Sequence, residues 1–341
     1  MKKIFLFIFA LLCSFGSAYA TKPKKKIMNA KEVGLGTITR NMAEAHINFL
    51  ASDNLEGREA GATGGRVAGD YLISMLKQWD IAPLFEKYEQ PFSAYRRERQ
   101  HNKDRFEVDL DSIAKLKEIP HQRIDLRNIL GMIEGKNPNE YVVVGAHYDH
   151  AGMDPKLEGD RIYNGADDNA SGVSAALQLA RAFKLSGEQP ERTIIFAFWD
   201  GEEEGLLGSK YFTKYWEGMN DVKSYMNFDM IGRNNNEGQP MYFVYFYTQA
   251  YPAFEQWLKS DIEDYHLQLE PNYRAWDNPI GGSDNGSFAK KGIPIIWYHT
   301  DGHPDYHMPS DEPFRLNWNK LVEITKAAYL ATWRLANENK Y

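Results

Sequence analysis

The sequence predicts an α/β fold in which a mostly parallel central sheet carries helices on both faces. Two observations indicate this fold. From about residue 127 onwards, short apolar or aromatic runs recur, and longer segments with the apolar spacing of helices separate them. Strands that are apolar on both faces are typical of parallel sheets covered on both sides. In such sheets ligands bind outside the carboxyl ends of the strands, so functional residues are expected in the loops that follow.

Apolar periodicity assigns the individual elements. Two helices are expected before the sheet, at 42–52 and 65–79. The expected strands are 128–133, 141–146, 194–199, 226–228, 241–247 and 293–297. The helices that alternate with these strands are expected at 170–185, 206–215, 253–265 and 318–337.

The first twenty residues have the pattern of a secretory signal peptide. Lys2 and Lys3 precede an apolar run at 4–12, and a small-residue cleavage motif follows at 18–20. The apolar run is too short for a membrane span, and a buried N-terminal helix is the alternative. The sequence therefore predicts export to the periplasm or the extracellular space after cleavage near Ala20, with no membrane span in the mature chain.

The remaining chain is expected to form one domain. Residues 21–38 are interpreted as a flexible lead-in and 39–341 as the domain itself. Within it, the charged and irregular segment 95–123 is interpreted as a lid or an edge hairpin. The oligomeric state is left open.

Composition restricts both the partners and the metal ligands. The chain has 341 residues and a net charge of −7, and an acidic balance argues against nucleic acid as a partner. The single cysteine, Cys13, lies in the predicted signal peptide. Any metal ligand of the mature chain must therefore be His, Asp or Glu.

Five segments place such ligands at or just after the predicted strand ends. The segments are 147–150, 165–169, 200–205, Asp229 and 305–311. Taken singly, each has a simpler explanation, such as a core histidine, a helix cap or a solvated acidic run. Their common position at one edge of a sheet favours a metal site, because buried charges need partners. Imidazole and carboxylate ligands suit zinc, and two neighbouring zinc ions need about five or six such ligands.

The motifs resemble those of the co-catalytic zinc exopeptidases of metallopeptidase family twenty-eight. This family includes aminopeptidase S, aminopeptidase Y, glutamate carboxypeptidase and the transferrin receptor ectodomain. The resemblance extends from about Leu50 to the C-terminus, and its motifs follow the order found in the family. It is strongest at 145–150, 165–172, 202–209, 227–230 and 306–311.

The resemblance implies two Zn²⁺ ions per chain. The implied metal ligands are His147, Asp167, Glu203, Asp229 and His307. Asp167 would bridge the ions. His147 and Asp229 would complete one ion, and Glu203 and His307 the other.

The resemblance also implies that Glu202 is the general base and that Asp149 orients His147. Several points stay open. Asn285 stands where the family usually has a histidine, and Tyr298 and Tyr306 are both possible oxyanion donors. The histidines that compete with His307 are His150, His299 and His303.

The expected function is that of a secreted zinc aminopeptidase that removes residues from the N-terminus of peptides. A glutaminyl cyclase on the same fold, a carboxypeptidase, a dipeptidase and a non-catalytic binding module are the alternatives. The preferred side chain of the substrate cannot be read from the sequence.

Overall fold

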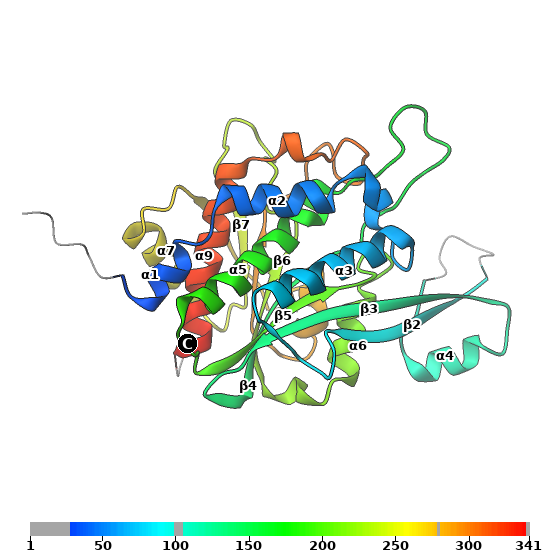
Figure 1. Ribbon diagram of the computed structural model, residues 1–341, viewed down its shortest axis with the longest axis horizontal. Helices are drawn as coiled ribbons and strands as arrows, with labels where there is room; N and C mark the ends of the chain where they lie inside the picture. Colours follow the sequence, from blue (N-terminus) through cyan, green and yellow to red (C-terminus); the bar gives the residue numbers. More distant parts are fainter. Residues whose placement is uncertain (1–27, 99–104, 278–279, 339–341) are drawn as a thin grey trace, which may run out of the picture.

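A mixed sheet of nine strands runs through the centre of the part of the chain that the computed structural model describes, residues 28–98, 105–277 and 280–338 (Figure 1). The predicted signal peptide lies outside these residues. The strands are β1 (Ala82–Pro83), β2 (Glu89–Arg97), β3 (His121–Ile133), β4 (Asn137–His147), β5 (Arg192–Trp199), β6 (Val222–Phe228), β7 (Tyr242–Tyr247), β8 (Glu270–Ala275) and β9 (Ile295–His299). Their order in the sheet is β1-β3-β5-β4-β6-β9-β7-β8, and β2 pairs with β3.

The centre of the sheet is parallel and its margins are mixed. β4 pairs in parallel with β5 and β6, and β6 pairs in parallel with β9. Antiparallel pairs join β3 to β1, β2 and β5, and β7 to β9. The prediction of a parallel sheet therefore holds for β5, β4, β6 and β9. The carboxyl ends of these four strands meet at one edge.

Helices cover both faces of the sheet, as the sequence predicts. They are α1 (Ala30–Leu35), α2 (Arg40–Leu50), α3 (Thr63–Gln78), α4 (Leu110–Leu116), α5 (Gly172–Ser186), α6 (Leu207–Tyr215), α7 (Ala253–Asp264), α8 (Asn285–Ala289) and α9 (Trp318–Asn337). Side chains of α2, α3, α5, α7 and α9 share one apolar core, and those of α6 and α8 belong to the core of the opposite face. The alternation of β5 shows the two faces: Ile194 and Phe196 enter the first core, and Ile195 and Trp199 enter the second.

Each strand and long helix expected from periodicity is present, with boundaries shifted by a few residues. The sequence did not predict β1, β2, β8, α1, α4 or α8. These elements are short or lie at the margins of the sheet, where one face stays in water. β8, for example, has no buried residue, so its sequence lacks the apolar run of a central strand.

The structure describes parts of both the expected lead-in, 21–38, and the segment 95–123. Within the expected lead-in, residues 30–35 form α1, and a Cβ added at Gly34 would lie 2.1 Å from the hydroxyl oxygen of Tyr329. Ile38 is also buried, so the described part of the lead-in is packed rather than flexible. The described residues of the segment 95–123 include α4 and the paired ends of β2 and β3, which form an antiparallel hairpin. The hairpin projects from the body of the molecule (Figure 1).

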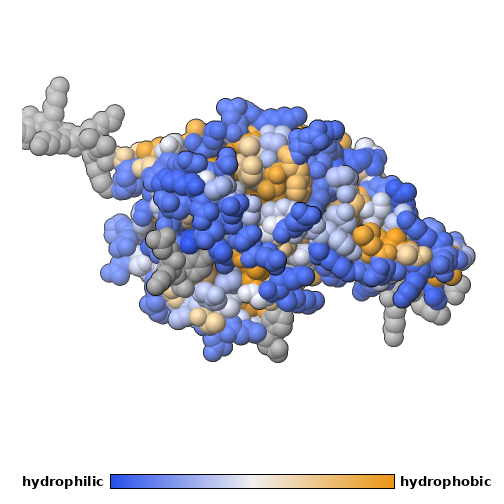
Figure 2. Space-filling model, turned by 90° about the horizontal axis from the view of Figure 1, so that it is seen from below, coloured by the Kyte–Doolittle hydropathy of each residue, from blue (hydrophilic) through white to orange (hydrophobic). Residues whose placement is uncertain are grey.

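The face of the molecule seen in Figure 2 is mostly hydrophilic and carries small apolar patches. Among the described helices, none combines the length and the apolar character that a membrane crossing requires.

Candidate metal centre

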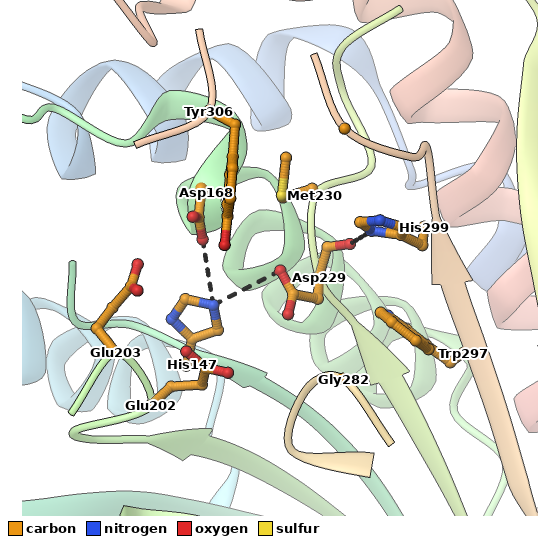
Figure 3. Close-up of a pocket in the computed structure, with 11 residues that line it drawn as sticks. His147, Asp168, Glu202, Glu203, Asp229, Met230, Gly282, Trp297, His299 and Tyr306 are labelled. Atoms are coloured by element: carbon orange, nitrogen blue, oxygen red, sulfur yellow. Dashed lines mark hydrogen bonds and ion pairs between the residues drawn. The ribbon is translucent and has the colours of Figure 1, made fainter. Parts of the chain in front are cut away.

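The carboxyl edge of the parallel strands carries a pocket of about 280 Å³. His147 is the last residue of β4, and Asp229 follows β6 directly. The loop after β5 supplies Glu202 and Glu203, and the loop before α5 supplies Asp168. Figure 3 shows these side chains pointing into the same space. Four separate segments of the chain therefore converge at the edge where a parallel sheet binds its ligands.

One group of potential ligands surrounds His147. Its Nε2 atom lies 3.3 Å from Asp168 Oδ1 and 3.6 Å from Asp229 Oδ1 (Figure 3). All three residues are buried, and their ligand atoms lie within 4.8 Å of one another. This spacing suits one metal ion between an imidazole and two carboxylates.

A second group shares the other oxygen of Asp168. His307 Nε2 lies 3.2 Å from Asp168 Oδ2 and 3.1 Å from Glu203 Oε2. His150 approaches the same pair of acids, because its Nδ1 lies 2.7 Å from Glu203 Oε1 and 3.8 Å from Asp168 Oδ2. His150 is buried, whereas the side chain of His307 is 42% exposed. Of the four histidines that the sequence left in competition, His150 and His307 thus contact Glu203.

The aspartate between the two groups is Asp168, not Asp167. The Asp167 side chain turns to the other side, where Oδ1 accepts a hydrogen bond from Gly232 N at 2.6 Å. Its Oδ2 lies 3.3 Å from Nε2 of the buried His303. The expectation that Asp167 is the aspartate shared by the two ligand groups is therefore wrong by one residue. The backbone of the loop decides which of two adjacent aspartates faces the pocket, and no residue pattern reports it.

Asp311 holds the backbone of this loop. Its Oδ1 and Oδ2 each lie 3.0 Å from the Asp167 nitrogen, and Oδ2 also accepts from the Asp168 nitrogen at 3.0 Å. The Asp311 carboxylate thereby fixes the peptide units on both sides of Asp167. Burial raises the pKa of Asp311 to about 6, with Asp167 as the next cause.

Asp149 positions both halves of the site. Its backbone oxygen lies 3.2 Å from His147 Nδ1, while its carboxylate is 3.8 Å from that atom. The carboxylate accepts hydrogen bonds from the backbone nitrogens of Glu202, at 3.0 Å, and Glu203, at 3.3 Å. Asp149 therefore orients His147 mainly through its carbonyl and the acidic loop through its side chain.

Glu202 lines the pocket without joining either ligand group. Among the residues that the structure describes, its carboxylate forms no hydrogen bond or ion pair, so it is free to exchange a proton. Burial of the carboxylate away from solvent raises the pKa of Glu202 well above its usual range. His147 opposes this rise, and the nearby Asp229 adds to it.

A buried arginine that the sequence analysis did not select braces the loops of the site. The Arg58 side chain is buried and donates to four backbone oxygens. These acceptors are Leu50 O at 2.6 Å, Asn164 O at 2.7 Å, Tyr148 O at 2.9 Å and Gly165 O at 3.0 Å. Tyr148 follows the ligand-bearing His147, and Gly165 lies three residues before Asp168. The one indication in the sequence is that Arg58 lies within the part of the chain, from about Leu50 onwards, that resembles the family.

The donor set fits zinc. The residues that the structure describes contain no cysteine, so imidazole and carboxylate groups are the zinc ligands that this part of the chain can offer. The acids also outnumber the bases, since four carboxylates face the pocket together with two imidazoles from β4 and β9. The hydrogen bonds that His307 donates to the Asp168 and Glu203 carboxylates raise the pKa of His307 to about 10. A potential that favours a protonated imidazole would also favour a divalent cation.

The open questions about tyrosine and asparagine are decided by position. Tyr306 lines the pocket, and its ring stacks on His307 with centroids 3.9 Å apart. Tyr298 packs in the core against Phe228 and does not line the pocket. Asn285 is buried and donates to Ile280 O at 2.8 Å, so it braces the backbone beside the pocket.

Comparison with known proteins agrees with this architecture. Leupeptin-inactivating enzyme 1 of Streptomyces exfoliatus is 33% identical over 230 residues, which are 61% of this chain and 48% of that protein. This chain spans about half the length of the first curated relatives it matches. Among solved structures, the LapA aminopeptidase of Legionella pneumophila has a TM-score of 0.66 at 22% identity, covering 97% of this chain and 80% of that one. A glutaminyl cyclase of Fimbriiglobus ruber has a TM-score of 0.65 at 14% identity, covering 87% and 95%.

At these identities the likeness to solved structures shows the fold alone. The family itself is shown by the model of peptidase family M28, which matches residues 128–332. This range contains each of the ligand-bearing segments described above, from His147 to His307. The chain therefore belongs to peptidase family M28, as its motifs implied.

Proposed function

We propose that this protein is an aminopeptidase that uses two zinc ions and removes residues from the N-terminus of peptides. The observation that carries the proposal is the sharing of one carboxylate: Asp168 offers one oxygen to His147 and the other to His307. A carboxylate shared in this way suits two neighbouring metal ions. His147, Asp168 and Asp229 would hold the first ion.

The second ion would be held by Asp168, Glu203 and His307. We assign His307 as its imidazole ligand because Nε2 lies at nearly equal distances from one oxygen of each acid. His150 instead makes one short contact with the other oxygen of Glu203, which suits a residue that orients this ligand. Bound zinc would lower the pKa of a water molecule and polarise the substrate carbonyl.

Glu202 is the group that moves the proton. As general base it takes a proton from the water that attacks the carbonyl carbon of the peptide. When the C–N bond breaks, Glu202 returns that proton to the departing amine. Tyr306 keeps its hydroxyl proton, because burial raises its pKa, and it can donate a hydrogen bond to the carbonyl oxygen.

The size and charge of the pocket support action at the N-terminus. A volume of about 280 Å³ suits one residue of a peptide rather than a long segment. Four carboxylates line the pocket, and this excess of acids would favour a free ammonium group over a terminal carboxylate. The alternative with a specific observation in its favour is glutaminyl cyclisation, because a cyclase shares the fold. His147 and the second ligand group favour the two-metal hydrolase.

The test uses the zinc-loaded chain and a panel of substrates. Leucine p-nitroanilide reports aminopeptidase activity, and its N-acetyl derivative reports cleavage without a free N-terminus. A C-terminally free hippuryl peptide reports carboxypeptidase activity, and a glutaminyl peptide reports cyclase activity. We expect hydrolysis of the first alone and about two zinc ions per chain by elemental analysis. Hydrolysis only of the hippuryl peptide, or cyclisation with one zinc ion, would contradict the proposal.

The role of Glu202 is tested with a matched neighbour. Glu202→Gln should reduce kcat about 10²- to 10⁴-fold while zinc content is unchanged. Glu204→Gln is the control, because Glu204 contacts Arg96 at 3.7 Å and does not line the pocket. Equal activity of the two variants would exclude Glu202 as the base.

We also propose export of the protein, supported by the charge and apolar pattern of residues 1–20. N-terminal sequencing of the protein from a secretion-competent host should begin after Ala20. An intact N-terminus in the exported fraction would contradict cleavage there.

A further inference from the structure

Five residues of the pocket lining carry neither a carboxylate nor a hydroxyl and are not His147, and we call the part of the pocket beside them the recess. Its walls are Met230, Gly282, Trp297, His299 and Gly302. In Figure 3 the ring of His299 lies on the far side of Asp229 from His147, with Trp297 below it. A residue whose carbonyl is held among the acids would place its side chain in this recess.

We propose that His299 selects N-terminal residues whose side chain has an apolar body and a hydrogen-bond donor at its tip. The proposal rests on the proposed aminopeptidase function and names the substrate class of that site. Tyrosine and glutamine are the natural residues that best combine these two properties.

The tautomer of His299 follows from its contact with the backbone. Its Nδ1 atom lies 2.6 Å from the carbonyl oxygen of Asp229. A carbonyl oxygen can only accept, so Nδ1 carries the proton. In the neutral ring Nε2 then bears a lone pair, and no described residue donates a hydrogen bond to it. Of the side chains that form the recess, His299 is the one that can accept a strong hydrogen bond.

The ring is fixed in this orientation by its neighbours. His299 and Trp297 are two residues apart on β9 and therefore project from the same face of the sheet. Their ring centroids lie 5.0 Å apart. Trp297 is stacked in turn on Phe246 at 4.7 Å. The acceptor is therefore presented from a rigid strand rather than a loop, which favours discrimination between substrates.

The rest of the recess accepts an apolar body. Trp297 and Met230 are almost fully buried and offer an indole face and a thioether. Gly282 has φ +107°, and a Cβ there would lie 3.2 Å from the Trp297 ring. Glycine at this position keeps the recess open beside the indole. An aromatic or long unbranched side chain would pack against these groups and leave its tip near Nε2.

The experiment compares size-matched substrates of the zinc-loaded full chain. The pairs are the p-nitroanilides of tyrosine and phenylalanine, and those of glutamine and methionine. We expect kcat/KM to favour the donor-bearing member by about three- to tenfold in at least one pair, the range of one net hydrogen bond. No preference in either pair would overturn the proposal.

The variants separate the two ring nitrogens. His299→Asn keeps a donor for the Asp229 carbonyl but has no acceptor at the position of Nε2, because its amide oxygen lies closer to the backbone. The preference should therefore fall to about one while the phenylalanine substrate is still cleaved. His299→Gln offers an oxygen near the position of Nε2, so part of the preference should return. His121→Asn is the matched control and should retain the tyrosine preference, because the exposed His121 also contacts a backbone oxygen through Nδ1 but does not line the pocket. An unchanged preference in His299→Asn, or in His299→Leu if the first variant does not fold, would overturn the proposal.

A binding measurement distinguishes this inference from the proposed function. Tyrosine hydroxamate and phenylalanine hydroxamate are titrated calorimetrically into the zinc-loaded protein, which requires no turnover. Tighter binding of the tyrosine compound, lost in His299→Asn, supports the recess even if no anilide is hydrolysed. Hydrolysis of the anilides with equal binding of both hydroxamates would keep the aminopeptidase and exclude the role of His299.

Discussion

The Asp311 carboxylate lies 3.0 Å from the backbone nitrogen of Asp168, the residue shared by the two ligand groups. Asp311 belongs to the same loop as His307, so one contact links two ligand-bearing segments that are far apart in the chain. A buried carboxylate that accepts backbone N–H groups fixes the peptide planes without reaching the metal positions.

Asp311→Asn should therefore weaken zinc binding while the protein still folds. An amide presents an N–H where the loop needs an acceptor, and we expect the zinc Kd to rise about 10- to 100-fold. Competition with a chromophoric chelator measures this change. Glu312→Gln is the control, because Glu312 accepts from the Asn164 side chain instead. An unchanged Kd in Asp311→Asn would contradict this account.

Asp168 and Asp167 can be separated by the same substitution. Asp168→Asn should lose at least one zinc ion per chain and more than about 100-fold in activity. Even the mutation of a residue that only hydrogen-bonds to a metal ligand reduces metal affinity or activity about 10- to 100-fold. In Asp167→Asn the amide oxygen can still accept from Gly232 N, and its NH₂ group can donate to His303. Metal content and activity should stay close to wild type. The opposite ranking of the two variants would restore Asp167 as the shared ligand.

Arg58→Met should destabilise the protein strongly. The substitution removes hydrogen bonds to four buried carbonyl oxygens, of which Gly165 O keeps a second donor in Ala170 N, and an unsatisfied buried group costs about 1–3 kcal/mol. We expect the free energy of unfolding in urea to fall by at least about 3 kcal/mol. Arg66→Met provides the comparison, because Arg66 is exposed and should change stability by less than about 0.5 kcal/mol. Similar losses in both variants would show that the bonds of Arg58 contribute little.

His46 predicts how stability depends on pH away from the metal centre. Burial, with a smaller effect of Arg181, lowers the pKa of His46 from 6.5 to about 4. Between these two pKa values the His46 imidazole is protonated in the unfolded chain and neutral in the folded chain. The free energy of unfolding therefore falls as the pH decreases through this window. Relative to His46→Phe, wild type should lose about 2 kcal/mol between pH 6.5 and pH 5.

Urea unfolding of both metal-free proteins at the two pH values measures the difference. Groups that titrate elsewhere act equally in both proteins and cancel. Parallel pH profiles would mean that His46 keeps its ordinary pKa in the fold.

The sequence by itself determined the class of the fold, the family and the segments of the site. Apolar runs such as those of β4 and β5 are long and continuous because both faces of a central strand are buried, and this pattern survives in one dimension. Motifs at strand ends predicted the convergence of His147, Glu203, Asp229 and His307, since parallel strands end at one edge. Marginal elements such as β8 leave a weaker trace because part of each stays in water.

Only the tertiary structure decided which atoms of those segments meet. Asp167 and Asp168 are adjacent residues of the same type, so the sequence does not distinguish them. The backbone of their loop, held by Asp311, turns Asp168 into the pocket and Asp167 towards His303. The role of Arg58 depends on acceptors from three segments, two of which are distant in the sequence. The free nitrogen of His299 depends on a carbonyl contributed by another strand end. Such contacts depend on direction and distance in space, and neither quantity is encoded in the spacing of residues along the chain.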